Sequence, residues 1–398
     1  MRIIDQISSR FPPFILLMAL LAAFPPLATD MYLPALPLLQ REWQVPLVTI
    51  NLTLVIFFMT YCVFLLVYGP LSDRYGRRPP LLIGVSVFIF ACLGCALAQN
   101  AGMMVWGRFL QGAGAAAASA IVLAICKDRF SGPQRQRIFI QIGVIVAAAP
   151  MIAPVLGGWI IQLLSWRWIF LLQALLAFCA LIGVWRMEES LRERSPSGCR
   201  EVGMSYLRLL RNRRYISLML TLSLTGIPVF AFIGGSADLY ITRFGYDERQ
   251  FGYFFGFNAL AFVLAPLTFS RLVRRFATMR LLPFGFMGML CSSLLLLVPI
   301  LPSPWGLTLP MFLLTFSFSF CRPAGNNLIL EQVNRDSGAA SSLMVFVFFS
   351  IGALSMWSFS LEWGGRDKII LLGQMGAASV TCTLVLWQVI KGRLRTGA

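Results

Sequence analysis

The sequence predicts an all-α membrane protein with twelve transmembrane helices in two pseudo-symmetric six-helix bundles. Three observations predict this class. Of the 398 residues, 58% are hydrophobic and only 12% are charged, whereas a soluble domain carries about 25% charged residues. The mean hydropathy is +0.78. Apolar runs recur along the chain, each close to the roughly 20 residues that cross a bilayer as a helix.

The apolar runs fall into two sets of six. We expect spans at residues 12–36, 47–68, 79–99, 103–126, 138–160 and 167–186, and then at 215–241, 250–270, 279–301, 305–328, 338–360 and 368–390. The sequence therefore predicts an N-terminal bundle (1–186), a polar, basic cytoplasmic linker (187–214) and a C-terminal bundle (215–398). Asp30-Met-Tyr32-Leu recurs as Asp238-Leu-Tyr240-Ile, a weak repeat that favours two parallel halves.

The basic residues indicate an orientation. With the N-terminus inside, the loops expected on the cytoplasmic side hold 25 of the 33 Lys and Arg, the outer loops hold six, and two lie within spans. This bias predicts a multi-pass protein with both termini cytoplasmic. The net charge of +17 is thus explained by topology and contact with anionic lipids, and no nucleic-acid partner is expected.

Some chemistry is disfavoured by composition. There is no histidine, so proton transfer inside the membrane would depend on carboxylates. The nine cysteines are scattered, mostly within apolar runs, and neither a disulfide framework nor a metal site is expected. We expect no cofactor.

Asp30 is the first candidate functional residue. It stands in FPPLATDMYLPALP, a run without any other charge, and Pro25, Pro26 and Pro34 bracket it. A charge at the centre of a span costs about 2.5–3.5 kcal/mol on insertion scales and needs a partner, a water-filled cavity or a proton. The prolines favour a bent, hydrated helix. Asp30 is either a proton acceptor or partner for a cationic substrate group, or a solvated acid near the outer interface.

Arg108 is the second candidate. It stands in WGRFLQGAGAAAASA, about six residues from the outer end of its span, as does Asp30. At 1.5 Å per residue, both lie about 9 Å deep. The pair could serve a proton carrier whose surroundings change as a cavity opens and closes, or it could form a static ion pair.

Three further groups stand out. The turn at 69–78 combines small residues with an acid that can accept hydrogen bonds at the start of the next helix, and with basic residues suited to the lipid surface. We expect a conformational latch there, the cytoplasmic gate, formed by Gly69, Asp73, Arg74, Gly76, Arg77 and Arg78. A second set predicts a kinked helix with a flat packing face that acts as a hinge: Pro150, Pro154, Gly157 and Gly158. Arg322, beside Pro323, is either structural or lines the cavity.

These segments together resemble the major facilitator superfamily. GPLSDRYGRRP at 69–79 is similar to its motif GxLxDRxGRRxxL, and RFLQGAG at 108–114 to its motif RxxQGxG. APVLGG at 153–158 resembles a motif of its antiporters, with Ala153 where glycine is usual. LATDMYLPALP at 27–37 resembles the first-helix signature of the bicyclomycin/chloramphenicol resistance (Bcr/CflA) family of drug:proton antiporters.

The resemblance implies the major facilitator fold, proton-driven export by alternating access, and a monomer in the bacterial inner membrane. Its implied partners are a small-molecule substrate, protons and membrane lipids. The implied proton-coupling and substrate cavity comprises Asp30, Tyr32, Arg108, Gln111 and Arg322.

We therefore expect proton-coupled efflux of small amphiphilic, drug-like compounds. The alternative on the same fold is an exporter or importer of a metabolite such as a nucleoside, amino acid or sugar. An enzyme is not expected. Catalysis would need a convergent cluster of His, Cys or carboxylate side chains, and the sequence has no histidine and very few acids within its spans.

Overall fold

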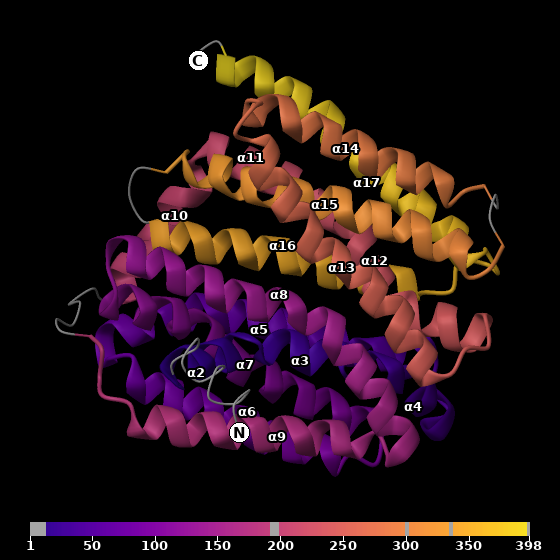
Figure 1. Ribbon diagram of the computed structural model, residues 1–398, viewed down its shortest axis with the longest axis horizontal. Coiled ribbons are helices and arrows are strands. Elements are labelled where there is room, and N and C mark those ends of the chain that lie inside the picture. Colours follow the sequence, from indigo (N-terminus) through magenta and orange to yellow (C-terminus); the bar gives the residue numbers. More distant parts are fainter. Residues whose placement is uncertain (1–12, 192–198, 299–301, 334–336, 396–398) are drawn as a thin grey trace, which may run out of the picture.

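The computed structural model describes residues 13–191, 199–298, 302–333 and 337–395, and all regular structure in these ranges is helical. Eleven helices are long and apolar enough to cross a membrane, or twelve when the bent first pair counts as one span. Figure 1 shows them lying side by side, with the indigo to magenta first half below and the orange to yellow second half above. The predicted twelve-helix fold class is confirmed.

Each expected span of the first half has its helix. The first span is broken into α2 (Pro13–Ala22), α3 (Phe24–Asp30), the short 3₁₀ turn η1 (Leu33–Ala35) and α4 (Leu36–Trp43), and the others are α5 (Leu47–Tyr75), α6 (Arg78–Ala96), α7 (Ala101–Arg129), α8 (Gly132–Leu163) and α9 (Arg167–Arg186).

The second half begins with α10 (Cys199–Arg211), which lies within the expected linker. The seventh span follows as α11 (Arg213–Ser223), the 3₁₀ turn η2 (Leu224–Gly226), α12 (Ile227–Ala237) and the π-helix η3 (Asp238–Arg243). The last five spans are α13 (Glu248–Leu272), α14 (Thr278–Leu295), α15 (Trp305–Leu330), α16 (Ser337–Ser360) and α17 (Lys368–Arg395).

The first span bends by 47° between Ala22 and Phe24. Pro25 and Pro26 follow in the first turn of α3, where the backbone nitrogens have no helical partner and a proline costs little. The bend expected from the prolines is therefore present, but it precedes them, and Asp30 ends the short helix that they begin.

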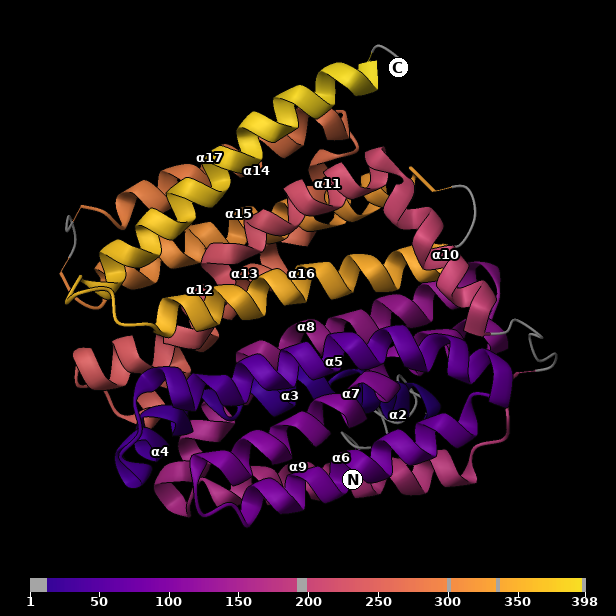
Figure 2. The ribbon, with the colours of Figure 1, turned by 180° about the vertical axis from the view of Figure 1, so that it is seen from behind.

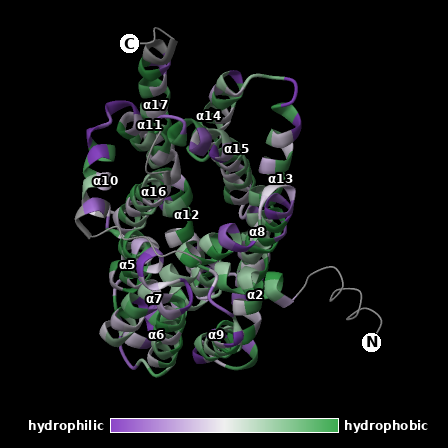
Figure 3. Ribbon diagram, turned by 90° about the vertical axis from the view of Figure 1, so that its left-hand side faces the viewer, coloured by the Kyte–Doolittle hydropathy of each residue, from purple (hydrophilic) through white to green (hydrophobic). Residues whose placement is uncertain are grey.

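Large apolar side chains cover the outside of the bundle. Phe90, Trp106 and Phe284 are each at least 70% exposed, which is typical of side chains that face lipid. Figure 3 looks at the end of the bundle that carries α10, and it shows hydrophobic (green) helices joined by segments with hydrophilic (purple) stretches. We call this end, with the α5–α6 turn, the basic face.

The two halves meet along two helix pairs, α8 with α13 and α5 with α16, and Figure 2 shows α16 beside α5 from behind. Near the face opposite the basic face, backbones touch: a Cβ on Gly252 would lie 2.8 Å from the Pro154 carbonyl oxygen, and one on Gly158 would lie 2.2 Å from that of Glu248. Asn51 Nδ2 also donates to the Gly234 carbonyl at 2.9 Å and to Ser360. The halves are closed at this face.

At the basic face the halves are separated by a cavity of about 560 Å³. One wall comes from α5 and α7 and the other from α10 and the start of α16. Asp73, Arg77 and Asp128 line it on the first wall, and Tyr206, Ser341 and Ser342 on the second. The described state is therefore closed at one face and hollow at the other.

Candidate functional site

The break in the first span prepares a polar site. The last four carbonyls of a helix have no partner within it, and in α3 these include Leu27 and Ala28. Two side chains supply the missing donors: Gln173 Nε2 reaches the Leu27 oxygen at 3.0 Å, and Arg108 Nη1 reaches the Ala28 oxygen at 2.9 Å. The broken helix is thereby held by α7 and α9.

Arg108 is fully buried. Its Nη1 also donates to Gln111 Oε1, and its Nε donates to the Thr53 carbonyl at 3.3 Å. The guanidinium lies over Phe57, with 4.5 Å to the ring centroid, and over Tyr32, with 4.9 Å. Dipoles and aromatic faces thus stabilise this cation. Its Nη2 has no hydrogen-bond partner among the described residues.

Gln111 extends the network on the same helix face. Its Nε2 donates to Gln173 Oε1 at 2.8 Å and lies 3.1 Å from Cys92 Sγ. Cys92 and Cys95 stand at CxxC spacing, but both thiols are free and buried inside α6, and the described residues contain no cluster of metal-ligating side chains. These cysteines pack against the network.

Asp30 lies inside the bundle, with only 7% of its surface exposed. Thr29 Oγ1 lies 2.9 Å from Asp30 Oδ1 and 3.0 Å from the Pro25 carbonyl oxygen. In the part of the chain that the structure describes, no basic side chain forms an ion pair with Asp30. The solvated acid at an interface is not what the structure shows.

A static ion pair between Asp30 and Arg108 is also not observed. The two residues do approach the same break in the first span, Arg108 through the Ala28 carbonyl two residues before Asp30. The guanidinium donates to the Ala28 oxygen, which the break leaves without a helical partner, and also to Thr53 and Gln111, so it does not need the carboxylate. Asp30 is left with a hydroxyl neighbour and no countercharge.

In the repeat of Asp30-Met-Tyr32-Leu as Asp238-Leu-Tyr240-Ile, the tyrosines make equivalent contacts and the aspartates do not. Tyr32 hydroxyl lies 3.1 Å from Thr53 Oγ1, and Tyr240 hydroxyl lies 2.7 Å from Thr308 Oγ1. The acids differ, because Asp238 pairs with Lys368 at 2.7 Å. Asp30 is thus the unpaired member of the repeated acids.

The expected gate is a network at the basic face. Arg77 contacts Asp73, Asp128 at 2.8 Å and Ser72 Oγ at 2.8 Å. Arg78 donates to the Trp185 carbonyl, Arg74 lies over the ring of Tyr75, and Gly69 faces the cavity. All of these contacts lie within the first half, so in this state they hold its ends of α5, α6, α7 and α9 together.

The expected role of Asp73 at the start of the next helix belongs to another residue. Glu189 Oε1 and Oε2 accept from the backbone nitrogens of Arg77 and Arg78 at 2.9 and 3.0 Å. A Cβ on Gly76 would lie 2.5 Å from Glu189 Oε2, so glycine lets the carboxylate approach. Burial opposes ionisation of Glu189, but four backbone donors outweigh it and lower the pKa of this carboxyl below its ordinary value.

The hinge segment forms a seam. α8 continues through Pro150 and Pro154 as one helix. A Cβ on Gly157 would lie 2.1 Å from the Met31 carbonyl oxygen, one residue after Asp30. Gly158 packs in the same way on α13, as described above. The two adjacent glycines thus bring α8 against the first span on one side and the second half on the other.

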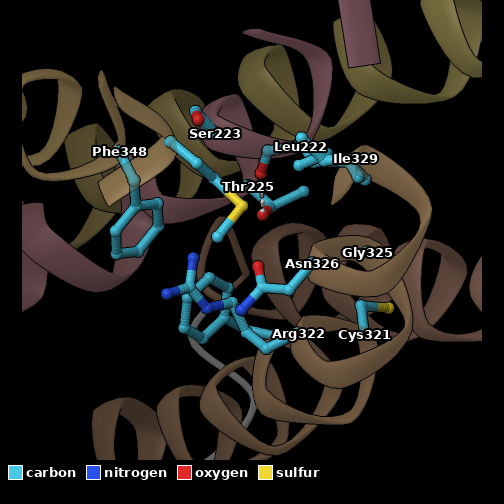
Figure 4. Close-up of a pocket in the computed structure, with 11 residues that line it drawn as sticks. Leu222, Ser223, Thr225, Cys321, Arg322, Gly325, Asn326, Ile329 and Phe348 are labelled. Carbon is cyan, nitrogen blue, oxygen red and sulfur yellow. Dashed lines mark hydrogen bonds between the residues drawn. The ribbon is translucent and has the colours of Figure 1, made fainter. Parts of the chain in front are cut away.

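Arg322 lies apart from Arg108, on α15 in the second half. Its guanidinium is 3.8 Å from the ring centroid of Phe348 and 5.6 Å from that of Phe318. Figure 4 shows it pointing into a pocket also lined by Asn326 and Thr225. Arg322 therefore does not lie with Asp30, Tyr32, Arg108 and Gln111 as expected. Of the two roles considered for it, structural or cavity-lining, the structure shows the second, in a separate pocket.

The comparison with protein-family models decides the identity. The model described as Major Facilitator Superfamily matches residues 17–356. The chain belongs to the Major Facilitator Superfamily. It is accordingly a multi-pass membrane transporter rather than an enzyme.

Curated relatives in this superfamily span almost the same length. The uncharacterized MFS-type transporter YdgK of Bacillus subtilis is 29% identical over 85% of this chain and 86% of its own. The bicyclomycin resistance protein homolog of Haemophilus influenzae is 27% identical over 96% and 97%. The chloramphenicol resistance protein of Pseudomonas aeruginosa is 27% identical over 83% and 79%. The resemblance to the Bcr/CflA family is confirmed.

Among solved structures, a D-xylose–proton symporter shares the fold, with a TM-score of 0.72 over 93% of this chain and 96% of its own, at 16% identity. This likeness concerns the fold alone.

Sequence reasoning missed an aromatic cluster where the halves of this major facilitator protein meet. Phe58 and Tyr61 of α5 contact Phe349 of α16 at 5.4 and 5.7 Å between ring centroids, and Phe348 joins through Phe230. The pairs Phe57-Phe58 and Phe348-Phe349 were visible in the sequence, but apolar pairs are common in spans, and only the packing of α5 on α16 distinguishes them.

Proposed function

We propose that the protein exports small amphiphilic compounds in exchange for protons, by alternating access across the bacterial inner membrane. The basic face is the cytoplasmic face, with both termini on that side, and the protein acts as a monomer. The observation that supports this most directly is Asp30, a carboxyl buried at a broken helix without a countercharge.

The surroundings of Asp30 suit a group that gains and loses a proton. Thr29 has a single hydroxyl proton and two acceptors within reach, Pro25 carbonyl and Asp30. When Asp30 is ionised, Thr29 can donate to it; when Asp30 is protonated, Thr29 can donate to Pro25 and accept from Asp30. Both states keep their hydrogen bonds, while only the protonated state removes the cost of a buried charge.

Protonation would then bias the two access states. A proton can shift a conformational equilibrium only through different affinity for the two states. Asp30 directly precedes Met31, whose backbone packs on Gly157 of the α8 seam. The next residue, Gly158, packs on α13 of the second half. A change of charge at Asp30 therefore acts close to the α8–α13 contact, which must open for release at the face opposite the basic face.

The gate has a role in the same cycle. The start of α16 faces the wall that carries Asp73 and Arg77 across the cavity. Closing the basic face would bring these walls together, and the network around Arg77 would move as one block because it is tied within the first half.

The proposed cargo follows from the cavity and the relatives. Aromatic side chains lie where the halves meet, and the cavity at the basic face combines apolar side chains with polar and charged ones, a mixed lining that suits drug-sized amphiphiles. Bicyclomycin and chloramphenicol resistance, in the names of two relatives, are outcomes of such export.

Asp30→Asn tests the proposal. In cells that lack other exporters, the wild-type protein should lower the accumulation of chloramphenicol or of another drug to which the cells are susceptible. A protonophore should abolish this effect. In Asp30→Asn, expressed in the membrane at the same level, the rate of proton-dependent efflux should fall at least tenfold.

Asp238→Asn is the matched control, because it changes the repeated acid that already has a lysine partner; it should keep proton-dependent efflux. Proton-dependent efflux by Asp30→Asn at the wild-type rate would refute the role of Asp30.

A further inference from the structure

The second half contains a cation that no described acid neutralises. Arg322 lies eight residues before the end of α15, about 12 Å from that end at 1.5 Å per residue. Basic side chains at such depth normally pair with acids or with backbone carbonyls. Arg108 does so, but Arg322 has no hydrogen bond or ion pair to any residue that the structure describes; its contacts are the rings of Phe318 and Phe348.

The stacking leaves the hydrogen-bonding edge of Arg322 unused. Aromatic rings occupy the face of the planar guanidinium, and its five N–H donors point outward in the plane, a geometry that matches the two oxygens of a carboxylate. Figure 4 shows the amide of Asn326 pointing into the same space. The Asn326 side chain likewise has no hydrogen bond within the described ranges, so further donors are available.

The backbone around this pocket is that of a binding site. The seventh span changes to the 3₁₀ turn Leu224–Gly226 beside the pocket. Ser355 Oγ donates to the carbonyl of Ile227, the first residue of α12, at 2.6 Å, and a Cβ on Gly226 would lie 2.7 Å from the Phe348 ring. Irregular backbone at membrane depth is tolerated where it lines a cavity, and broken helices mark the binding sites of transporters.

The pocket adjoins the large cavity. α16 lines both: Met344 and Phe348 face the Arg322 pocket, and Ser342 and Val345 face the cavity at the basic face. In the described state the pocket has a volume of about 20 Å³, which is room for about one water-sized group. A small terminal group can enter it while a larger apolar body lies against the aromatic cluster.

We propose that Arg322, with Asn326, binds a carboxylate-type anionic group, so that the exporter accepts aromatic acids and zwitterions in addition to neutral compounds. This inference rests on the proposed export function for its physiological meaning, but the binding itself does not depend on proton coupling. The same N–H donors could bind a chloride ion, and the experiment distinguishes a carboxylate ligand from chloride.

Binding is tested on the purified full-length protein in detergent, by thermal unfolding with 2-naphthoate and with 2-naphthamide, which differs by replacing the carboxylate with an amide. The naphthoate should raise the unfolding temperature of wild type, the naphthamide should raise it less, and Arg322→Gln should remove the difference. The shift by naphthoate should also appear in a buffer that contains no chloride and no other carboxylate.

Asn326→Leu is a second variant that leaves the charge in place; it should weaken naphthoate binding several-fold and leave naphthamide binding unchanged. Equal shifts by acid and amide, no shift by the acid, or an undiminished acid-specific shift in Arg322→Gln would overturn the proposal. A shift by chloride with none by naphthoate would show an inorganic anion site and overturn it as well. Proton-dependent efflux by Asp30→Asn at the wild-type rate, with these shifts intact, would refute the role of Asp30 and not the anion site.

Discussion

Two arginines within spans show how the surroundings of a residue decide its role. Arg108 donates to the Ala28 carbonyl, which the broken helix leaves free, so its removal would leave this buried acceptor without a donor, at a cost of about 1–3 kcal/mol. Arg322 satisfies nothing in the described chain. The first is therefore chiefly a positioning residue for the first span, and the second is available to a ligand.

Two glycines in the same motif should respond differently to alanine. Gly76 has φ of +99° and ψ of 163°, a region open essentially only to glycine, and a side chain there costs about 1–3 kcal/mol. Gly76→Ala should lower the unfolding temperature. Gly69→Ala should not, because nothing lies within 4 Å of its Cβ. Equal unfolding temperatures for the two variants in one detergent would contradict this.

Glu189 predicts a pH dependence at the residue scale. Its pKa lies below the ordinary value of 4.5, because backbone donors outweigh burial. A carboxyl with a lowered pKa in the folded state stabilises that state above its ordinary pKa, and the effect is lost as the pH falls through the folded value. The difference in thermal stability between wild type and Glu189→Gln should be full at pH 7 and shrink below about pH 4.5. A difference that is constant down to pH 3 would contradict it.

At the scale of elements, we expect the α8–α13 seam to determine whether this face is closed or open. Gly158→Ala places a methyl group against the Glu248 carbonyl, and overpacking of this kind costs about 1–3 kcal/mol. The cost falls only on the state that is closed at this face, so the population should shift about fivefold or more toward the other state. Cysteines placed across the seam should crosslink more slowly.

Gly143→Ala is the control on the same helix, since nothing lies within 4 Å of that Cβ, and its crosslinking should match that of wild type. Unchanged crosslinking in Gly158→Ala would show that the seam does not determine closure.

The sequence predicts helices better than their contacts. Hydrophobic runs place every span, with ends within about seven residues of the observed helix ends, because lipid demands a satisfied backbone over a fixed thickness. The position of the break at Ala23, the cap from Glu189 and the third partner Asp128 of Arg77 depend on packing between distant segments. The same holds for Asp30: its sequence marks it as unusual, but only the fold shows that Arg108 is engaged elsewhere.

At the scale of the whole molecule, the distribution of basic residues agrees with the position of the cavity. The described state is closed where few basic residues lie and hollow at the basic face, which the distribution of Lys and Arg predicts to be the cytoplasmic face. A drug entering from the cell would meet this cavity first. In the proposed cycle the proton would reach Asp30 from the opposite side, when the α8–α13 seam opens.

The central claim, that Asp30 exchanges a proton as the halves alternate, is tested most directly in proteoliposomes that contain the purified protein and an internal pH indicator. On addition of a transported drug to one side, wild type and Asp238→Asn should move protons opposite to the drug, and Asp30→Asn should move none. Drug-driven proton movement by Asp30→Asn at the wild-type rate would contradict the claim.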